Sequence, residues 1–250
     1  MSDLILQTDG LTKEFLGFTA VRNLDLRVRR GTIHALIGPN GAGKTTVFNL
    51  LTKFLRPSAG RILFKGEDVT RVRPAEIARR GMVRSFQISA VFPHLTVREN
   101  VRVALQRKLG NSFHFWRSQS VLDELNGRAE ELIGWVGLDA FLDRPAGELA
   151  YGRKRALEIA TTLALDPEML LLDEPMAGLG SEDIGRIAEL VKRVAADRTV
   201  LMVEHNLSVV ADLSDVITVL ARGEILAEGG YDEVSRHPAV IEAYVGTGHG

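Results

Sequence analysis

The sequence contains no cysteine, and this absence excludes disulfide frameworks and metal sites built on thiolates. Long apolar runs are also missing. The run MLLL at 169–172 is typical of those present and is far below the ~18 residues that cross a membrane. Strong charge of either sign is absent as well, because 31 Lys and Arg residues are matched by 32 Asp and Glu residues. The overall charge therefore gives no reason to expect nucleic acid or an anionic membrane as a partner.

The first ten residues, MSDLILQTDG, lack the basic region and apolar core of a secretory signal peptide, so we expect none. The sequence shows no internal repeat and no low-complexity segment. It has 250 residues, of which 45% are hydrophobic. Such a chain suits one large domain or two unequal lobes, with ample length for a core.

Hydrophobic patterning predicts strands of two kinds. Alternating apolar residues at 24–28 predict a half-buried antiparallel strand, with another strand at 4–8. Segments 32–38, 169–175 and 200–205 are apolar at nearly every position before their ends. That pattern is typical of parallel strands buried on both faces.

The segment GPNGAGKTT at 38–46 follows one of these buried strands and opens a helix predicted at 44–54. It matches the phosphate-loop pattern G-x-x-x-x-G-K-[ST]. In that pattern backbone N–H groups wrap phosphate oxygens, the lysine reaches the terminal phosphates, and the next hydroxyl ligates Mg²⁺. We predict a nucleotide-binding loop, with Thr45 also a metal ligand, formed by Gly38, Pro39, Asn40, Gly41, Ala42, Gly43, Lys44, Thr45 and Thr46.

Two carboxylates end the apolar segment 169–175. An open α/β sheet binds its ligand at the carboxyl ends of its strands, so both carboxylates are expected near the phosphates. We predict that Asp173 holds Mg²⁺ through its water shell. We predict that Glu174 faces the γ-phosphate and polarises the attacking water.

Two further polar side chains end predicted strands. His205 closes the segment 200–205, where a neutral imidazole is expected to contact the γ-phosphate and orient the catalytic group. Gln87 closes the segment 84–87 and is expected to reach Mg²⁺ or the attacking water. Upstream, the aromatic ring of Phe15 is predicted to stack on adenine. Because no Asn-Lys-x-Asp segment selects guanine, the sequence favours ATP over GTP.

A helix predicted to begin near Gly152 carries Arg153, Lys154 and Arg155 in its first turn. Cations are disfavoured at the positive end of a helix dipole, by about 0.3–1 kcal/mol each. One interpretation is a solvated basic face. The other is half of an anion site, in which free backbone N–H groups and cations await an anion from elsewhere.

In this order and spacing, the motifs resemble those of the nucleotide-binding subunit of an ABC transporter. The resemblance covers essentially the whole chain. It implies that Phe15 is the adenine-stacking aromatic, that 38–46 is Walker A and that Gln87 is the Q-loop glutamine. It further implies a Walker B aspartate, a catalytic glutamate, a switch histidine and an ABC signature, which are Asp173, Glu174, His205 and the segment Leu149, Ala150, Tyr151, Gly152 and Arg153.

The predicted fold class is α/β. A P-loop NTPase core with a parallel sheet and an N-terminal antiparallel β subdomain is expected over residues 1–88 and 165–250, where β-rich and α/β patterns prevail. A helical signature subdomain is expected as an insertion at 89–164.

The resemblance also implies how the subunit works. Two nucleotide-binding subunits of this family pair head to tail, and the signature helix of one faces the γ-phosphate bound by the other. The anion missing at Gly152 is then ATP held by a partner. The implied cofactors are ATP and Mg²⁺. The implied partners are a second nucleotide-binding subunit, identical or different, transmembrane permease subunits and, indirectly, a periplasmic or extracellular binding protein. No nucleic acid is expected, and the implied location is peripheral, on the cytoplasmic face of the inner or plasma membrane.

The chain departs from the usual signature Leu-Ser-Gly-Gly-Gln. Ala150 lacks the hydroxyl that would cap the helix, whereas Arg153 adds a charge in place of glutamine. Gly180 stands where the family usually has Asp or Asn, which puts a cross-subunit polar contact in doubt.

The variant LAYGRKRALEIA, the aromatic stretch at 110–120 and the tail HPAVIEAYVG resemble those of branched-chain amino acid importers. We therefore expect an ATPase that powers import of branched-chain or related amino acids. Two alternatives are a lipid or lipopolysaccharide transporter and a soluble ABC ATPase of DNA repair or translation. The soluble class commonly has two cassettes or a long coiled coil, whereas this chain has one cassette and no sustained heptads.

Overall fold

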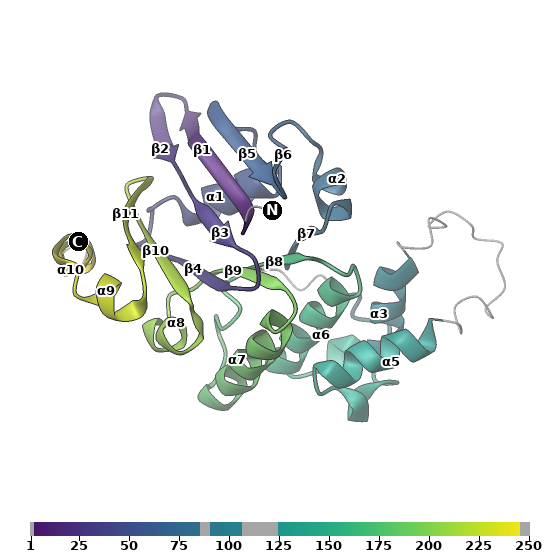
Figure 1. Ribbon diagram of the computed structural model, residues 1–250. Coiled ribbons are helices and arrows are strands. Elements are labelled where there is room, and N and C mark those ends of the chain that lie inside the picture. The colour runs from purple at the N-terminus through teal and green to yellow at the C-terminus, as the bar shows by residue number, and fades with distance from the viewer. Residues whose placement is uncertain (1–2, 86–90, 107–124, 246–250) are drawn as a thin grey trace. The chain divides into compact units, whose positions relative to one another are not determined.

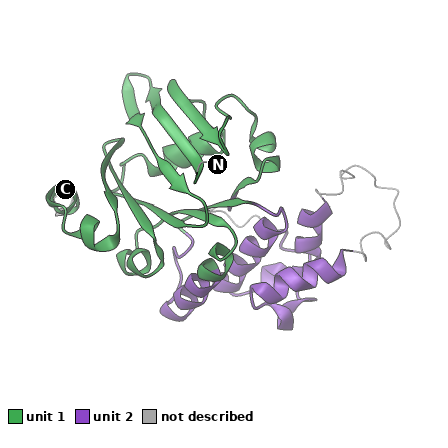
Figure 2. Ribbon diagram, in the orientation of Figure 1, with its two compact units in different colours: residues 1–83, 168–174, 191–250 green, residues 84–167, 175–190 purple. Residues whose placement is uncertain are grey.

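The computed structural model describes residues 3–85, 91–106 and 125–245 (Figure 1). The chain divides into two compact units (Figure 2). Unit 1 comprises Met1–Val83, Glu168–Glu174 and Val191–Gly250, and unit 2 comprises Arg84–Pro167 and Pro175–Leu190.

Unit 1 contains an antiparallel sheet built around one long strand. The strands are β1 (Leu4–Phe15), β2 (Phe18–Leu24), β3 (Arg27–Arg29), β5 (Ala59–Phe64) and β6 (Glu67–Asp68). Their order is β2-β1-β5-β6, and β3 also pairs with β1.

The predicted strand at 4–8 is thus only the first half of β1, and β2 was not expected. Gly10 has a φ of 57°, and the pairing register of β1 with β2 shifts after Leu11. Such an irregularity disturbs the two-residue alternation from which a strand is predicted. At 24–28 the expected alternation holds, since Leu24, Leu26 and Val28 are buried, but the chain there passes from β2 into β3.

The second sheet has the order β11-β10-β4-β9-β8-β7. Its strands are β4 (Ile33–Ile37), β7 (Met82–Ser85), β8 (Met169–Asp173), β9 (Thr199–Val203), β10 (Val216–Ala221) and β11 (Glu224–Gly229). The pairs β10–β4, β4–β9 and β9–β8 are parallel, and β11 is antiparallel to β10. The three central strands are buried at every residue, as their apolar sequences predicted.

A hydrophobic core joins the two sheets within unit 1. Helix α1 (Lys44–Leu51) supplies Val47, Phe48, Leu50 and Leu51 to this core, and both sheets contribute to it. The helix is shorter than the predicted range 44–54, because the chain turns at Lys53, whose φ is 68°. The other helices of this unit are α2 (Pro74–Arg79), α8 (Leu207–Leu213), α9 (Tyr231–Ser235) and α10 (Pro238–Val245).

Unit 2 is helical, as the pattern from residue 94 to residue 164 predicted. Helices α3, α5 and α6 pack against one another. The elements are α3 (Val97–Gln106), α5 (Asn126–Trp135), the 3₁₀ helices η2 (Asp139–Phe141) and η3 (Ala146–Glu148), α6 (Tyr151–Leu163) and the first part of α7 (Ser181–Ala195). Residues 175–190 group with this unit, whereas the predicted division assigned them to the core.

The fold class predicted from the sequence is confirmed: an antiparallel β part, a parallel sheet and a helical insertion are all present. Gln87 and the aromatic stretch at 110–120 lie outside the described residues, as does the end of the chain after residue 245. Across the described ranges, none of the helices is long and apolar enough to span a membrane.

Candidate functional site

The phosphate-loop segment lies between β4 and α1, as predicted, and its lysine is held by the loop itself. Lys44 is buried, and its Nζ donates to the carbonyl oxygens of Gly38 at 2.6 Å and Pro39 at 3.0 Å. The loop therefore curls around the ammonium group. Thr45 is exposed at the start of α1, so its hydroxyl is open to a ligand.

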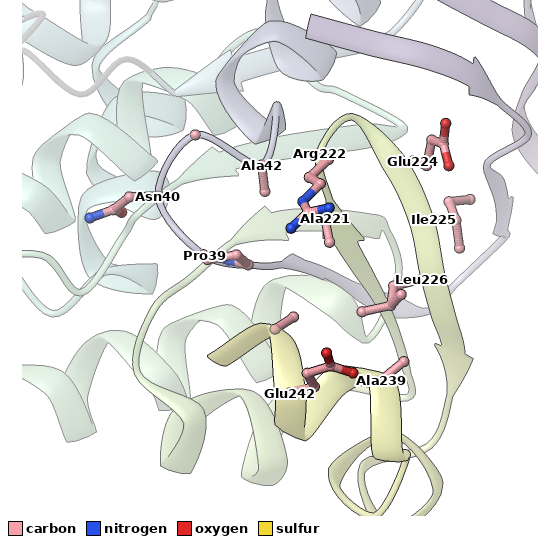
Figure 3. A pocket seen from close by; sticks show the side chains of 12 residues that line it. Pro39, Asn40, Ala42, Ala221, Arg222, Glu224, Ile225, Leu226, Ala239 and Glu242 are labelled. Atoms are coloured by element: carbon pink, nitrogen blue, oxygen red, sulfur yellow. The ribbon is translucent and has the colours of Figure 1, made fainter. Parts of the chain in front are cut away.

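Two glycines of this loop have no room for a side chain. A Cβ on Gly38 would meet the carbonyl oxygen of Leu220, and a Cβ on Gly43 would lie 2.6 Å from the carbonyl oxygen of Ala20. Both residues also have positive φ, 148° and 102°, which other residues rarely adopt. Figure 3 shows the loop beside the turn between β10 and β11, and the N–H of Gly223 in that turn donates to the Ala42 carbonyl at 3.0 Å. The loop is therefore fixed by its neighbours as well as by its own sequence.

Two carboxylates at the end of β8 lie close enough to Lys44 to affect it. Burial lowers the pKa of Lys44, and the negative charges of Glu174 and Asp173 partly oppose that effect. Asp173 is the last residue of β8 and is only 1% exposed. The predicted convergence of the phosphate loop and the strand-end carboxylates is therefore present within unit 1.

Glu174 has a strained backbone and a partner at hydrogen-bonding distance. Its φ is 46°, in the left-handed region that is uncommon for residues other than glycine. Its backbone N–H donates to the Val203 carbonyl at 2.9 Å, and its Oε1 lies 2.9 Å from Nε2 of His205. Strain of this kind clusters at functional sites. The structure thus brings together the glutamate and the histidine that the sequence predicted separately.

Two residues that position His205 were missed by the sequence analysis. The buried carboxylate of Glu204 accepts a hydrogen bond from the His205 backbone N–H at 3.0 Å. Asn206 caps α8, because its side-chain oxygen accepts from the N–H groups of Ser208 and Val209. An Asn immediately before a short apolar run is a helix-start signal, so the cap was detectable in the sequence. No sequence pattern predicted that the side chain of Glu204 would be buried.

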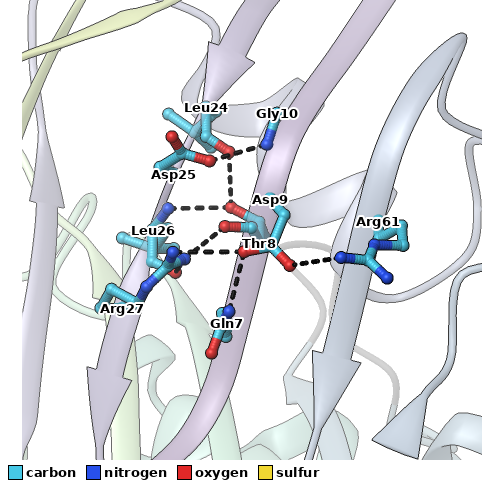
Figure 4. Close-up of polar contacts among 9 residues, drawn as sticks. All are labelled: Gln7, Thr8, Asp9, Gly10, Leu24, Asp25, Leu26, Arg27 and Arg61. Atoms are coloured by element: carbon cyan, nitrogen blue, oxygen red, sulfur yellow. Dashed lines mark hydrogen bonds and ion pairs between the residues drawn. The ribbon is translucent and has the colours of Figure 1, made fainter.

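Phe15 is the last residue of β1 and is 40% exposed, and the ammonium of Lys13 lies 4.9 Å from the centroid of its ring. The strand leading to it is well fixed (Figure 4). The Thr8 hydroxyl donates to the Leu24 carbonyl at 2.7 Å and accepts from the Leu26 N–H at 2.8 Å. An exposed aromatic ring on a fixed strand is compatible with the predicted stacking on adenine, which stays a prediction.

The signature segment of unit 2 opens a helix, as predicted. Ala150 is the N-cap residue of α6, and no side chain caps this helix start. Leu149 is buried, whereas Tyr151 is 53% exposed. The backbone N–H groups at this helix start are therefore without the side-chain acceptor that the usual serine would supply.

Two of the three cations in the first turn have different roles. The guanidinium of Arg153 stacks on the ring of Phe141, 4.2 Å from its centroid. Arg155 is buried, pairs with Glu158 at 2.7 Å and donates to the Pro175 carbonyl at 3.3 Å. The hypothesis that all three cations face an anion is therefore wrong for Arg155, which is part of the packing of unit 2. The sequence did not reveal this, because burial of Arg155 depends on which face of α6 is covered.

Two glycines near the signature have opposite environments. A Cβ on Gly152 would lie 2.4 Å from the carboxylate carbon of Asp183, in the first turn of α7, so a larger residue here requires the Asp183 side chain to move. Gly180, by contrast, has open space where a Cβ would be. The absence of Asp or Asn at position 180 is therefore not imposed by packing within this unit.

The donor set fits Mg²⁺. The Thr45 hydroxyl and the Asp173 carboxylate offer hard oxygen ligands, which Mg²⁺ prefers together with water and substrate phosphates. Within the described ranges, no group of three or more His, Asp or Glu side chains could hold a metal ion by itself. The predicted ligand Gln87 lies outside those ranges.

Comparisons with known proteins identify the family of this chain. A family model for ABC transporters matches residues 21–177, and a model described as a branched-chain amino acid ATP-binding cassette transporter matches residues 224–250. The high-affinity branched-chain amino acid transport ATP-binding protein BraF of Pseudomonas aeruginosa is 40% identical over 98% of this chain and 99% of its own length.

Solved structures give the same result. A crystal structure of an ABC transporter's ATP-binding cassette in its ADP conformation has a TM-score of 0.86 at 31% identity, covering 98% of this chain and 100% of its own. A dimeric bacterial ABC transporter cassette has a TM-score of 0.76 at 25% identity, covering 90% of this chain and 98% of its own. With its phosphate loop, strand-end carboxylates and signature helix, the chain belongs to the ABC transporter family as an ATP-binding cassette with ATPase chemistry.

Proposed function

We propose that this cassette hydrolyses ATP to power the import of branched-chain or related amino acids, and that it works as a head-to-tail dimer. The observation that carries the chemistry is the contact between Glu174 and His205 at 2.9 Å, beside a phosphate loop that holds Lys44. The match of the C-terminal segment 224–250 and the identity to BraF support the cargo class. They also favour amino acids over the lipid and soluble alternatives.

The reaction is attack of water on the γ-phosphorus of ATP, in line with the β–γ bridging oxygen. The bond between that phosphorus and the bridging oxygen breaks, and ADP leaves with the electron pair. Glu174 orients the water and accepts its proton, while His205 holds the Glu174 carboxylate in place and contacts the γ-phosphate. Lys44 supplies positive charge to the β- and γ-phosphates, where negative charge develops. Phe15 stacks on the adenine ring.

The metal ligands are Thr45, Asp173 through water, and Gln87. When bound, Mg²⁺ neutralises charge on the β- and γ-phosphate oxygens. The residues of this chain then have two separate roles. Backbone N–H groups of 38–46 bind the phosphates, and the carboxylate of Glu174 accepts the proton of the attacking water.

The signature segment completes the site of a second subunit. The uncapped start of α6 offers N–H donors, and Arg153 adds a cation that compensates for the missing serine hydroxyl at Ala150. In this proposal ATP closes the dimer and hydrolysis opens it. The dimeric state of a similar cassette supports pairing.

We further propose that permease subunits of the membrane receive this motion, and that a periplasmic or extracellular binding protein delivers the cargo. The cassette then lies on the cytoplasmic face of the membrane as a peripheral subunit. No nucleic acid takes part.

Pairing is tested by mixing two inactive variants, Lys44→Ala and Arg153→Glu. Each mixed dimer retains one site in which an intact phosphate loop faces an intact signature. The mixture should recover about a quarter of wild-type ATP turnover, since half of the dimers are mixed and each has one of two sites. Each variant alone, at the same total concentration, is the control. A mixture no more active than the separate variants would contradict the head-to-tail arrangement.

The cargo is tested in proteoliposomes that contain the cassette and the permease subunits with which it co-purifies. ATP-dependent uptake of radiolabelled leucine, isoleucine or valine is expected, and Glu174→Gln should abolish it. Movement of a fluorescent lipid is measured in parallel. Lipid movement without amino acid uptake would replace this proposal with the lipid-transporter alternative.

A further inference from the structure

The segment 178–183 touches the signature segment at two points within unit 2. A Cβ on Gly178, whose φ is 74°, would lie 3.5 Å from Cε1 of the Tyr151 ring. A Cβ on Gly152 would lie 2.5 Å and 2.8 Å from the two carboxylate oxygens of Asp183. Because Gly152 is a buried residue of the first turn of α6, the Asp183 carboxylate packs directly against the start of the signature helix.

The carboxylate of Asp183 lies toward the positive end of α6. Every Cα–Cβ bond of a helix is tilted toward the helix N-terminus, so a group at the Cβ position of Gly152 lies on the side of the uncapped N–H groups. Asp183 is also in the first turn of α7. A negative charge is favourable at both helix starts. The chain therefore supplies an anion of its own beside the place where the phosphate of a partner subunit is expected.

The charge of Asp183 is only partly neutralised. Nη1 of Arg186 lies 3.6 Å from an Asp183 oxygen, which is longer than a hydrogen bond. The same guanidinium donates through Nη2 to Glu182 at 2.5 Å. One cation shared between two carboxylates leaves a net negative charge. The Asp183 side chain is 36% exposed, so this charge is close to solvent as well as to α6.

We propose that Asp183 regulates closure of the dimer by opposing the γ-phosphate that the partner subunit presents to α6. The inference rests on the proposed head-to-tail pairing. In the single subunit, the carboxylate stabilises the two helix starts. In the closed dimer, it is a like charge beside the phosphate, whereas Arg153 is an attractive one. Asp183 therefore weakens the closed state and favours opening.

The expected effect of removing this charge is on dimerisation. Repulsion between like charges several ångströms apart at a partly exposed site changes an equilibrium constant about fivefold. A symmetric dimer has two such sites, so its dissociation constant should fall about 25-fold. Binding of ATP to the phosphate loop of a single subunit should not change, because Asp183 belongs to the other half of the composite site.

The experiment uses Asp183→Asn, which removes the charge and keeps the shape of the side chain that packs on Gly152. The change is made in Glu174→Gln, the variant in which ATP should accumulate the closed dimer. Glu182→Gln is the matched control. It makes the same charge change in the same turn of α7, at a side chain that is 81% exposed and bonded to Arg186.

The dimer dissociation constant with ATP and Mg²⁺ is measured by analytical ultracentrifugation at about 0.1 M and about 1 M KCl. The Debye length falls from about 10 Å to about 3 Å between these concentrations, so a repulsion is screened and a packing effect is not. Nucleotide affinity of the monomer is measured with a fluorescent ATP analogue, and folding by thermal denaturation.

We expect Asp183→Asn to lower the dissociation constant about 25-fold at the lower salt concentration and much less at the higher one. Monomer affinity should stay the same, and Glu182→Gln should change the dimer by less than about threefold. An unchanged or weaker dimer in Asp183→Asn would overturn the proposal, as would a gain that high salt does not reduce.

The two levels of the argument fail differently. If Glu174→Gln alone forms no dimer with ATP, the proposed head-to-tail function is contradicted. If Glu174→Gln dimerises with ATP and Asp183→Asn does not tighten that dimer, only the role of Asp183 is wrong.

Discussion

Helices α1 and α6 both begin without a side-chain cap, yet their surroundings differ. Before α1 the chain wraps back on itself, and two loop carbonyls hold Lys44. Before α6 the chain is extended at Ala150, and Arg153 lies on an aromatic ring instead. The first helix start is an enclosed cradle. The second offers donors and charge without an enclosure.

This difference explains why one motif is complete within nine residues and the other is not. Consecutive residues form the phosphate loop, so a single subunit is expected to bind the phosphates of ATP by itself. The signature helix supplies an open surface, and in the proposed dimer its anion arrives already bound to another subunit. A helix start without a side-chain cap can therefore belong to a site complete in one subunit or to a site shared by two subunits. The conformation of the preceding loop distinguishes the two cases.

The largest expected effect is on the phosphate-loop side, at Glu174. Glu174→Gln keeps the size of the side chain but removes the base. Hydrolysis should fall by about 10²–10⁴-fold, while ATP binding survives because Lys44, Thr45 and Asp173 are intact. Single-turnover hydrolysis and nucleotide binding are measured together, with the exposed residue change Glu14→Gln as the control. Undiminished hydrolysis would remove Glu174 from the catalytic role.

The binding-competent variant should also accumulate the closed dimer with ATP and not with ADP. Light scattering checks this shift, and its absence would argue against the open surface of α6 as the second half of the site.

The next effect concerns the strand that carries the phosphate loop. His34 on β4 is 1% exposed, with Nε2 2.7 Å from the Thr218 hydroxyl oxygen, and that hydroxyl donates to Glu228. The hydroxyl therefore accepts from the imidazole N–H. Burial lowers the pKa of His34 from 6.5 to about 4, so the unfolded chain binds the proton more readily than the folded one.

The free energy of unfolding should consequently decrease as pH falls from 6.5 to about 4, and this contribution should stop changing below that. The full loss is about 3 kcal/mol, at 1.36 kcal/mol per pKa unit. His34→Gln keeps an N–H donor but does not titrate. Urea unfolding at pH 7 and pH 4.5 should show a smaller pH dependence in His34→Gln, and equal dependence in both proteins would contradict the prediction.

A smaller effect is expected on the signature side, at Phe141. Phe141→Leu removes the ring beneath Arg153, and a cation–π contact at a surface is worth about 0.5–1 kcal/mol. ATP turnover by the dimer should fall about two- to fivefold, with nucleotide affinity of the monomer unchanged. Phe92→Leu, at an exposed phenylalanine of unit 2, is the control. A weaker nucleotide affinity of the Phe141→Leu monomer would show that the signature helix and the phosphate loop do not act independently.

The smallest effect is expected at Gly180, whose carbonyl accepts from the Ile184 N–H at the start of α7. The position has room for a side chain, and replacing a glycine N-cap with Asp gains a few tenths of a kcal/mol. Urea unfolding of Gly180→Asp measures this, and Gly180→Asn separates capping from charge. A loss of stability would contradict the open space at this position.

The sequence was most informative where function depends on neighbouring residues. The loop 38–46 could be predicted because its pattern is contiguous, and Glu174 and His205 because parallel strands end at one edge of a sheet. The environment of Arg155 could not be predicted, because its burial depends on which face of α6 is covered. The bulge after Gly10 likewise hid the length of β1, because it interrupts the alternation on which strand prediction depends.

The left-handed backbone of Glu174 has a consequence for the history of such chains. A non-glycine residue in this conformation raises the energy of the fold by about 1 kcal/mol. Glycine at this position would relieve the strain and at the same time delete the carboxylate. Natural selection for turnover therefore opposes selection for stability at one and the same codon. A duplicated copy that is no longer selected for transport is expected to lose Glu174 early. It would persist as a well-folded protein that binds ATP without hydrolysing it.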